Sequence, residues 1–281
     1  MAKSVKANKK PVAASVAAIK KPVAKSVKAV EKPAHRWQQS LIDTGAIFAK
    51  PWRRYRGFIF QGYLIAAIVV FLILAVLAHT VAYFTFDVTI TQELQKFKPE
   101  WFGALMYALS WIGFAPQVDV ISVLVVLFLL ASGLKWETVV AFVNVIGISV
   151  LGTGIKLLVG RARPAADLVN VISQLSDYSF PSGHVLYFTA FFGFLAFLTY
   201  TLVEHSGWRR LLLAIFGGMV SLIGLSRIYE GQHWASDVLA SYLLGSIWLA
   251  LTVYFYRWGK TRFFVNQPVA KEEVANSPVK A

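Results

Sequence analysis

Two histidines stand where polar segments meet apolar ones, and both have neighbours that suit phosphate chemistry. His233 is followed four residues later by Asp237, a spacing that places two side chains on one face of a helix. His184 follows Ser182 and Gly183 at the start of an apolar run. A serine there can cap a helix, a glycine lets the backbone approach a ligand, and the free amides of the first turn attract an anion.

Three cations accompany these residues: Lys156, Arg163 and Arg227. Two helical turns separate Lys156 from Arg163, so both can point one way, and Pro164 ends any helix there. Phosphoryl transfer requires positioning of the phosphate and stabilisation of its oxygens, which guanidinium groups and amides supply. Because the nearby acids are outweighed by cations, we expect neither a metal nor another cofactor. Arg161 is either a ligand for a second phosphate or a solvated loop residue.

The composition indicates a chain that dissolves in lipid. It has 281 residues, of which 57% are hydrophobic and 15% charged, and its mean hydropathy is +0.59. It contains no cysteine, which excludes a thiolate nucleophile, a cysteine-ligated metal and a disulfide framework. We therefore expect an all-α integral membrane protein.

The net charge of +14 is concentrated near the N-terminus, where residues 1–37 carry nine Lys and one Arg against one acid. This segment repeats KSVKA and KKPVA and cannot form a core, so residues 1–57 are predicted to be a disordered, Lys/Ala/Pro-rich cytoplasmic tail. The tail either attaches to anionic lipid headgroups or serves only as a solubilising extension. We expect no nucleic-acid partner and no cleavable signal peptide. The oligomeric state stays open.

Apolar runs of about 20 residues predict six transmembrane helices. The expected spans are 60–83, 118–134, 138–158, 184–202, 211–225 and 238–256. The short apolar segment 101–114 lies between two prolines and is interpreted as an interfacial or re-entrant helix. The predicted organisation is thus a catalytic membrane domain at 58–258, followed by a short cytoplasmic tail at 259–281.

The distribution of basic residues predicts the orientation. The N-terminal tail and the loops after the second, fourth and sixth spans are basic, so the positive-inside rule places both termini in the cytoplasm. The polar stretches that follow the third and fifth spans then share the outer face. We expect a plasma membrane or bacterial inner membrane protein with its active site on the periplasmic or extracellular side.

Three motifs occur in order among these spans: K-x6-R-P at 156–164, P-S-G-H at 181–184 and S-R-x5-H-x3-D at 226–237. Together they resemble the type 2 phosphatidic acid phosphatase (PAP2) superfamily of membrane lipid phosphate phosphatases, over about residues 60–256. Each motif alone is weak evidence, and their combination is specific. The resemblance implies a PAP2-like helical core and metal-independent hydrolysis of a lipid phosphate or diphosphate.

The resemblance also implies a role for each motif residue. His233 would attack phosphorus to form a phosphohistidine, and Asp237 would hold its ring in the attacking tautomer. His184 would protonate the leaving oxygen and then activate water. The phosphate ligands would be Lys156, Arg163, Ser182, Gly183 and Arg227. Undecaprenyl diphosphate, phosphatidic acid and phosphatidylglycerol phosphate all suit such a site, and the residues do not choose among them.

Other functions stay open at this point. A membrane anion transporter, or a non-catalytic lipid-phosphate binder, would also use cations and helix N-termini, although neither needs His233 beside Asp237. Soluble relatives of the superfamily bind vanadate and oxidise halides, and the six predicted spans argue against that activity. The histidines outside the motifs, His79 and His205, are interpreted as interfacial.

Overall fold

The structure, a computed structural model, describes residues 55 and 57–264, and all regular elements in this part of the chain are helices. They are Gly57–Thr80, α2 (Thr85–Gln95), α3 (Glu100–Ile112), α4 (Gln117–Ala131), α5 (Lys135–Val159), α6 (Gly183–Leu202), α7 (Gly207–Tyr229) and α8 (Ala235–Phe263). The chain divides into two units, Met1–Tyr63 and Leu64–Ala281, and α2 to α8 belong to the second. The predicted N-terminal tail lies almost wholly outside the described residues, and α8 continues five residues beyond the predicted end of the membrane domain.

Within residues 57–264, five helices are long and apolar enough to cross a membrane: Gly57–Thr80, α5, α6, α7 and α8. A sixth span arises if α3 and α4 count as one, since they are bent by 63° at the break between them. With 15 residues, α4 is about 22 Å long and too short to cross a hydrocarbon core of about 30 Å by itself. The prediction of an all-α integral membrane protein is confirmed.

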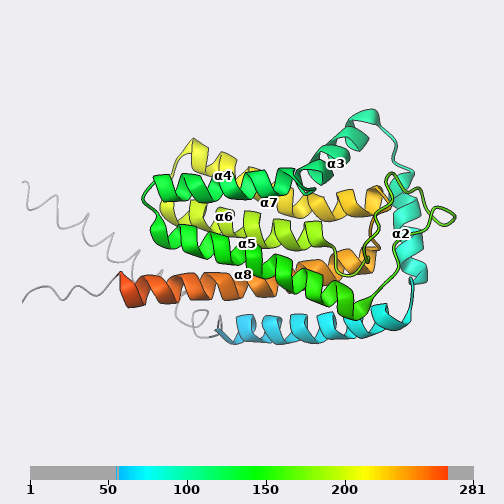
Figure 1. The fold of residues 1–281 in the computed structure, drawn as a ribbon, viewed down its shortest axis with the longest axis horizontal. Helices are drawn as coiled ribbons and strands as arrows, with labels where there is room; N and C mark the ends of the chain where they lie inside the picture. The colour runs from blue at the N-terminus through cyan, green and yellow to red at the C-terminus, as the bar shows by residue number, and fades with distance from the viewer. Residues whose placement is uncertain (1–54, 56, 265–281) are drawn as a thin grey trace, which may run out of the picture. The chain divides into compact units, whose positions relative to one another are not determined.

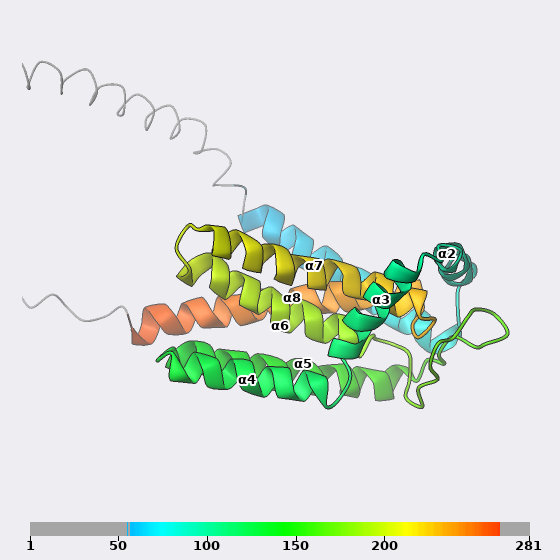
Figure 2. The same ribbon diagram turned by 90° about the horizontal axis from the view of Figure 1, so that it is seen from above.

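Helix α6 lies at the centre of the bundle and packs against α5, α7 and α8 (Figures 1 and 2). Its phenylalanines at 188, 191 and 194 are fully buried. Small residues on neighbouring helices let α6 approach closely: a side chain at Gly245 of α8 would come within 2.8 Å of Thr189. The central position of α6 fixes its N-terminus, where the P-S-G-H motif lies.

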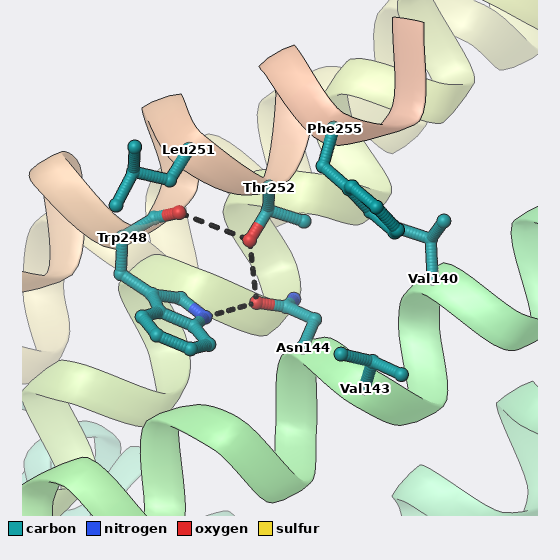
Figure 3. A pocket seen from close by; sticks show the side chains of 7 residues that line it. All are labelled: Val140, Val143, Asn144, Trp248, Leu251, Thr252 and Phe255. Atoms are coloured by element: carbon teal, nitrogen blue, oxygen red, sulfur yellow. Dashed lines mark hydrogen bonds between the residues drawn. The ribbon is translucent and has the colours of Figure 1, made fainter. Parts of the chain in front are cut away.

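A buried amide ties α5 to α8 and α6. Asn144 Oδ1 accepts hydrogen bonds from Trp248 Nε1 at 2.8 Å and Thr252 Oγ1 at 3.3 Å (Figure 3), and Nδ2 donates to the carbonyl of Ala190 at 2.9 Å. Polar groups inside a bilayer need such partners. The cavity of about 160 Å³ beside Asn144 is mostly apolar. It lies about 18 Å along α5 from Lys156 and is separate from the predicted site.

The connections from α5 to α6 and from α7 to α8, which carry the motifs, lie at one end of the bundle, where α2 runs across the ends of the other helices (Figures 1 and 2). The loop between α5 and α6 lies at the same end and is attached to α2. Gln95 Nε2 donates to the carbonyls of Asn170 at 2.7 Å and Tyr229 at 2.9 Å, and Gln92 Nε2 donates to that of Leu168 at 2.9 Å. Thus α2, which the apolar runs did not predict, holds the two loops that carry the site.

Candidate active site

The loop after α5 begins with a left-handed turn. Gly160 has φ +64°, which favours glycine, and ends the helix four residues after Lys156. The chain then folds back, and the Ser179 amide donates to the carbonyl of Arg161 at 2.8 Å. Arg163 is therefore not on the helix, and the predicted spacing of two helical turns does not apply. The reversal, rather than helical periodicity, brings Arg163 to the same place as Lys156.

His233 is 1% exposed and lies in the short connection between α7 and α8. Its Nδ1 is 2.8 Å from the carbonyl oxygen of Ser179, which can only accept a hydrogen bond. Nδ1 therefore carries the proton and leaves a lone pair on Nε2, 3.2 Å from Arg163 Nη1. Burial, together with the charges of Arg163 and Arg227, lowers the pKa of His233 well below its usual 6.5. At neutral pH Nε2 of this ring is an unprotonated, potentially nucleophilic nitrogen that accepts a hydrogen bond from Arg163.

Asp237 approaches His233 without a direct hydrogen bond, because its Oδ2 lies 3.8 Å from Nδ1. The prediction that His233 and Asp237 share one face of a helix is wrong, since α8 starts at Ala235, after His233. Oδ2 instead accepts from Ser179 Oγ at 2.5 Å and from the Trp234 amide at 3.0 Å. The carboxylate thus contacts the residue whose carbonyl orients the imidazole. Asp237 can position the ring through Ser179, and this role stays a prediction.

Arg161 has a different position from either sequence-based interpretation. Its side chain is fully buried, so it is not a solvated loop residue. It is paired with Asp237, donates to Asp87 Oδ2 at 3.0 Å and to Ser236 Oγ at 2.7 Å, and also donates to the Ala82 carbonyl at 3.0 Å. With its donors used inside the protein, it does not face the site as a second phosphate ligand. It joins α2 to the start of α8.

Lys156 and Arg163 both form ion pairs with the carboxylate of Asp177. Lys156 Nζ lies 2.8 Å from Asp177 Oδ2 and Arg163 Nη2 lies 2.6 Å from Oδ1, and the Asp177 side chain is 56% exposed. Although partial burial acts to raise it, hydrogen bonds and charge from Lys156 and Arg163 lower the pKa of Asp177 from 3.8 to about 2. Arg163 Nη1 also donates to the Gln232 carbonyl at 2.7 Å. Asp177 lies outside the three motifs, so the motifs did not indicate this contact.

Arg227 is buried at the last turn of α7 and is surrounded by polar partners. It contacts Ser110 Oγ and Gln232 Oε1, and its Nη1 lies 3.1 Å from Glu230 Oε2. Burial raises the pKa of Glu230 against the opposing effects of Ser110 and Arg227. Arg227 Nε and Glu230 Oε1 are buried and have no hydrogen-bond partner. A ligand with complementary donors and acceptors would satisfy these two atoms.

Ser182 is the N-cap residue of α6, as predicted, but its side chain makes no capping hydrogen bond. Its Oγ is buried without a partner, while its backbone amide donates to Ser241 Oγ at 2.7 Å. A side chain at Gly183 would meet open space. A free hydroxyl, an open glycine and a helix N-terminus together suit an anion. A cavity of about 180 Å³ between α5 and α6 is lined by both Gly183 and Lys156.

His184 faces α3 from the first turn of α6. Its Nε2 is 3.1 Å from the carbonyl of Ser110, and its ring packs edge-on against Phe114 at 4.6 Å between centroids. The ring lies so close to Gly113 that a larger residue there would collide with it. Since a carbonyl only accepts, Nε2 carries a proton. The bent α3–α4 pair therefore contributes to the site, which the motifs did not indicate.

Two further histidines in the described part of the chain, His79 and His205, lie outside the motifs. His79 Nδ1 lies 3.0 Å from the carbonyl of Val159, and His205 lies in the turn between α6 and α7 at the other end of the bundle. In residues 57–264, no three side chains of His, Asp or Glu come together in a group that could hold a metal ion. Metal independence stays a prediction.

Comparison with known proteins identifies relatives of the part of the chain that carries the site. A sequence model of the PAP2 superfamily matches residues 138–260, which include every predicted site residue. "Phosphatidylglycerophosphatase B" of Bacillus subtilis is 27% identical over 179 residues, 62% of this chain and 85% of the relative. "Undecaprenyl-diphosphatase" of Sulfolobus acidocaldarius is 36% identical over 116 residues, 40% of this chain and 50% of that protein.

Among solved structures, the crystal structure of a transmembrane PAP2 type phosphatidylglycerolphosphate phosphatase from Bacillus subtilis is similar to this chain. The TM-score is 0.62 at 25% sequence identity, and the match covers 71% of this chain and 98% of the other. The fold is thus shared over nearly the full length of that phosphatase.

Proposed function

Because this chain belongs to the PAP2 superfamily, we propose that it hydrolyses a lipid phosphate or diphosphate by nucleophilic attack of His233. The observation that supports this proposal most directly is the orientation of the His233 ring, whose Nδ1 is hydrogen-bonded to the Ser179 carbonyl and whose Nε2 is directed to Arg163. A neutral imidazole held in this tautomer presents its lone pair where a phosphate bound to Arg163 would lie. Imidazoles oriented in this way act as nucleophiles.

The reaction takes two steps. In the first, a bond forms between His233 Nε2 and phosphorus while the bond from phosphorus to the leaving oxygen breaks, and His184, protonated on both nitrogens, gives that oxygen its Nδ1 proton while Nε2–H stays on the Ser110 carbonyl. In the second, His184 takes a proton from water, the resulting hydroxide attacks phosphorus, and the bond to His233 breaks to release inorganic phosphate. The equatorial oxygens receive charge from Lys156, Arg163 and Arg227 in both steps.

The groups of the pocket support this assignment of ligands. Ser182 Oγ and Arg227 Nε are buried and lack partners, so an incoming phosphate gives them acceptors. The cavity between α5 and α6 is lined by Lys156 and Gly183 and also by the apolar side chains of Ile148 and Leu186. A phosphate at its polar end with an apolar chain beside α6 fits the character of a lipid substrate.

The substrate class follows from this pocket and from the relatives. Two relatives are named for phosphatidylglycerol phosphate and undecaprenyl diphosphate, both lipids with a terminal phosphate. Either suits a site at the membrane surface. We place this surface outside the cytoplasm, with both termini inside, on the basis of the positively charged loops at the other end of the bundle. The Lys-rich tail, for which membrane attachment is the proposed role, lies outside the described residues.

The test is a trapped phosphoenzyme. Purified full-length protein is mixed with radiolabelled lipid phosphate in excess EDTA and quenched in alkali, which preserves phosphohistidine. The wild type is expected to form a labelled protein and to release phosphate, while His233→Ala does neither. His35→Ala, which changes a histidine outside both the motifs and the matched family region, is the matched control and keeps the label. Normal turnover by His233→Ala would refute the proposal, and an anion transporter or a lipid-phosphate binder would release no phosphate at all.

A further inference from the structure

The turn between α6 and α7 lies at the end of the bundle opposite the loops that carry the motifs (Figures 1 and 2). A second cationic pocket lies at this turn. It is a hollow of about 460 Å³, lined by Tyr200, His205, Ser206, Gly207, Arg209, Arg210 and Leu213. Along α7, about 27 Å separate Arg209 from Arg227. A phosphate bound near Arg227 therefore cannot reach this hollow.

Arg209 provides the hollow with a buried guanidinium group that has an unpaired donor. Only 6% of the residue is exposed, and its Nε is buried without a hydrogen-bond partner. Its Nη2 donates to the Tyr200 carbonyl at 2.8 Å, and the guanidinium lies over the Tyr200 ring at 4.6 Å. None of the ion pairs found in the described residues involves Arg209. A buried guanidinium with an unused donor and no counter-ion is costly unless a ligand supplies an acceptor.

The N-terminus of α7 points into the same hollow. Ser206 caps this 23-residue helix by accepting the Arg209 amide on its Oγ at 3.2 Å. The first amides of a helix have no intrahelical acceptor, so those of Gly207 and Trp208 stay available to an anion. A side chain added at Gly207 would meet open space. The acid of this turn, Glu204, does not line the hollow.

We propose that this hollow binds a phosphate group, separate from the catalytic phosphate. The Arg209 guanidinium supplies a planar donor, the first turn of α7 supplies amides and partial positive charge, and His205 and Arg210 flank the opening. The phosphate belongs either to an anionic phospholipid headgroup or to a soluble phosphate compound. The proposal stands on this geometry alone and does not depend on the catalytic function.

Two substitutions test the site by different routes. Arg209→Gln removes the guanidinium. Gly207→Pro removes an amide donor and leaves Arg209 in place. Proline suits the first position of a helix, and Ser206 before it already has φ −148° and ψ 170°, the extended conformation that precedes proline. Arg262→Gln, at an exposed arginine near the end of α8, is the control for a general loss of positive charge.

The measurement is the midpoint of thermal unfolding, followed by tryptophan fluorescence, in the full-length Arg163→Gln protein so that a predicted catalytic ligand is missing. One arm titrates inorganic phosphate in detergent. The other compares nanodiscs of phosphatidylcholine with and without phosphatidylglycerol. A ligand that binds only the folded state raises the midpoint. A rise with inorganic phosphate assigns a soluble source, and a rise with phosphatidylglycerol alone assigns a headgroup.

We expect the rise to survive Arg262→Gln and to be lost in Arg209→Gln, with probe affinity falling by about tenfold or more, as for a lost charged hydrogen bond. Gly207→Pro should reduce the affinity several-fold, and it decides the question if Arg209→Gln does not fold. The proposal is overturned if neither probe raises the midpoint. It is also overturned if Gly207→Pro keeps the full rise, or if Arg262→Gln loses as much as the two site variants.

Discussion

Replacing Asp177 with Asn removes a carboxylate that contacts both Lys156 and Arg163. Both cations are proposed phosphate ligands, so a substrate must compete with this carboxylate. The pKa of Asp177 is lowered from 3.8 to about 2, which corresponds to roughly 2 kcal/mol of favourable interaction. Because 56% of the side chain is exposed, solvent screening reduces this to about 1 kcal/mol. Removal of the competitor should therefore strengthen phosphate binding by about fivefold.

The assay is inhibition of lipid phosphate hydrolysis by inorganic phosphate. We expect the inhibition constant to fall about fivefold in Asp177→Asn, while the free energy of unfolding falls by about 1 kcal/mol at neutral pH. The lowered pKa means that the stabilising interaction is complete above pH 4 and disappears as the pH falls towards 2. The stability difference between wild type and variant should disappear over the same interval.

Asp167→Asn is the matched control, since it makes the same change of charge at an exposed position of the same loop. It should leave both the inhibition constant and the stability unchanged. An inhibition constant that is unaltered or raised in Asp177→Asn would show that the carboxylate does not compete with phosphate. Equal effects of the two variants would show that only the overall charge of the loop matters.

Three further predictions concern stability, pH and orientation. Arg161→Gln should lower the free energy of unfolding by about 3–5 kcal/mol, measured by chemical denaturation, because two buried carboxylates lose their cation. The acid limb of the pH–rate profile should lie below pH 6.5, since the lowered pKa keeps His233 neutral as the pH falls; a limb above 6.5 would contradict this assignment. Cysteine at Ser176 should react with an impermeant maleimide from outside intact cells and cysteine at Ser132 should not, and the reverse pattern would invert the proposed topology.

The spans could be predicted because long apolar runs are local features of the sequence. Their ends were less accurate, since hydropathy reports where the lipid begins and not where a helix ends. The fifth span was predicted to be 211–225, whereas α7 extends from Gly207 to Tyr229. Arg209 and Arg227 lie inside the helix but interrupt the apolar run. Helix α2 contains no long apolar run, so the hydropathy criterion did not predict it, although it covers the site.

The motifs identified the residues that meet at the site, but not how they meet. Lys156 and Arg163 were expected to point the same way because two helical turns separate them, yet a reversal after Gly160 brings them together on Asp177. His233 and Asp237 were expected to share one helix face, yet His233 precedes the helix. Spacing arguments assume one continuous element, and both pairs straddle a helix end. Contacts between residues far apart in the chain leave no periodic signal in a single sequence.

The buried pairs of Arg161 explain why the site needs a segment outside the matched family region, which begins at residue 138. Asp87 in α2 bonds to Arg161, and it also accepts the Ser236 amide at 2.8 Å. Arg161 in turn pairs with Asp237, whose other oxygen receives the hydroxyl of Ser179. Buried charges keep a fixed geometry only when each has a partner. The orientation of His233, set by the Ser179 carbonyl, therefore depends on α2, although within the described part of the chain no residue of α2 forms a hydrogen bond with the imidazole.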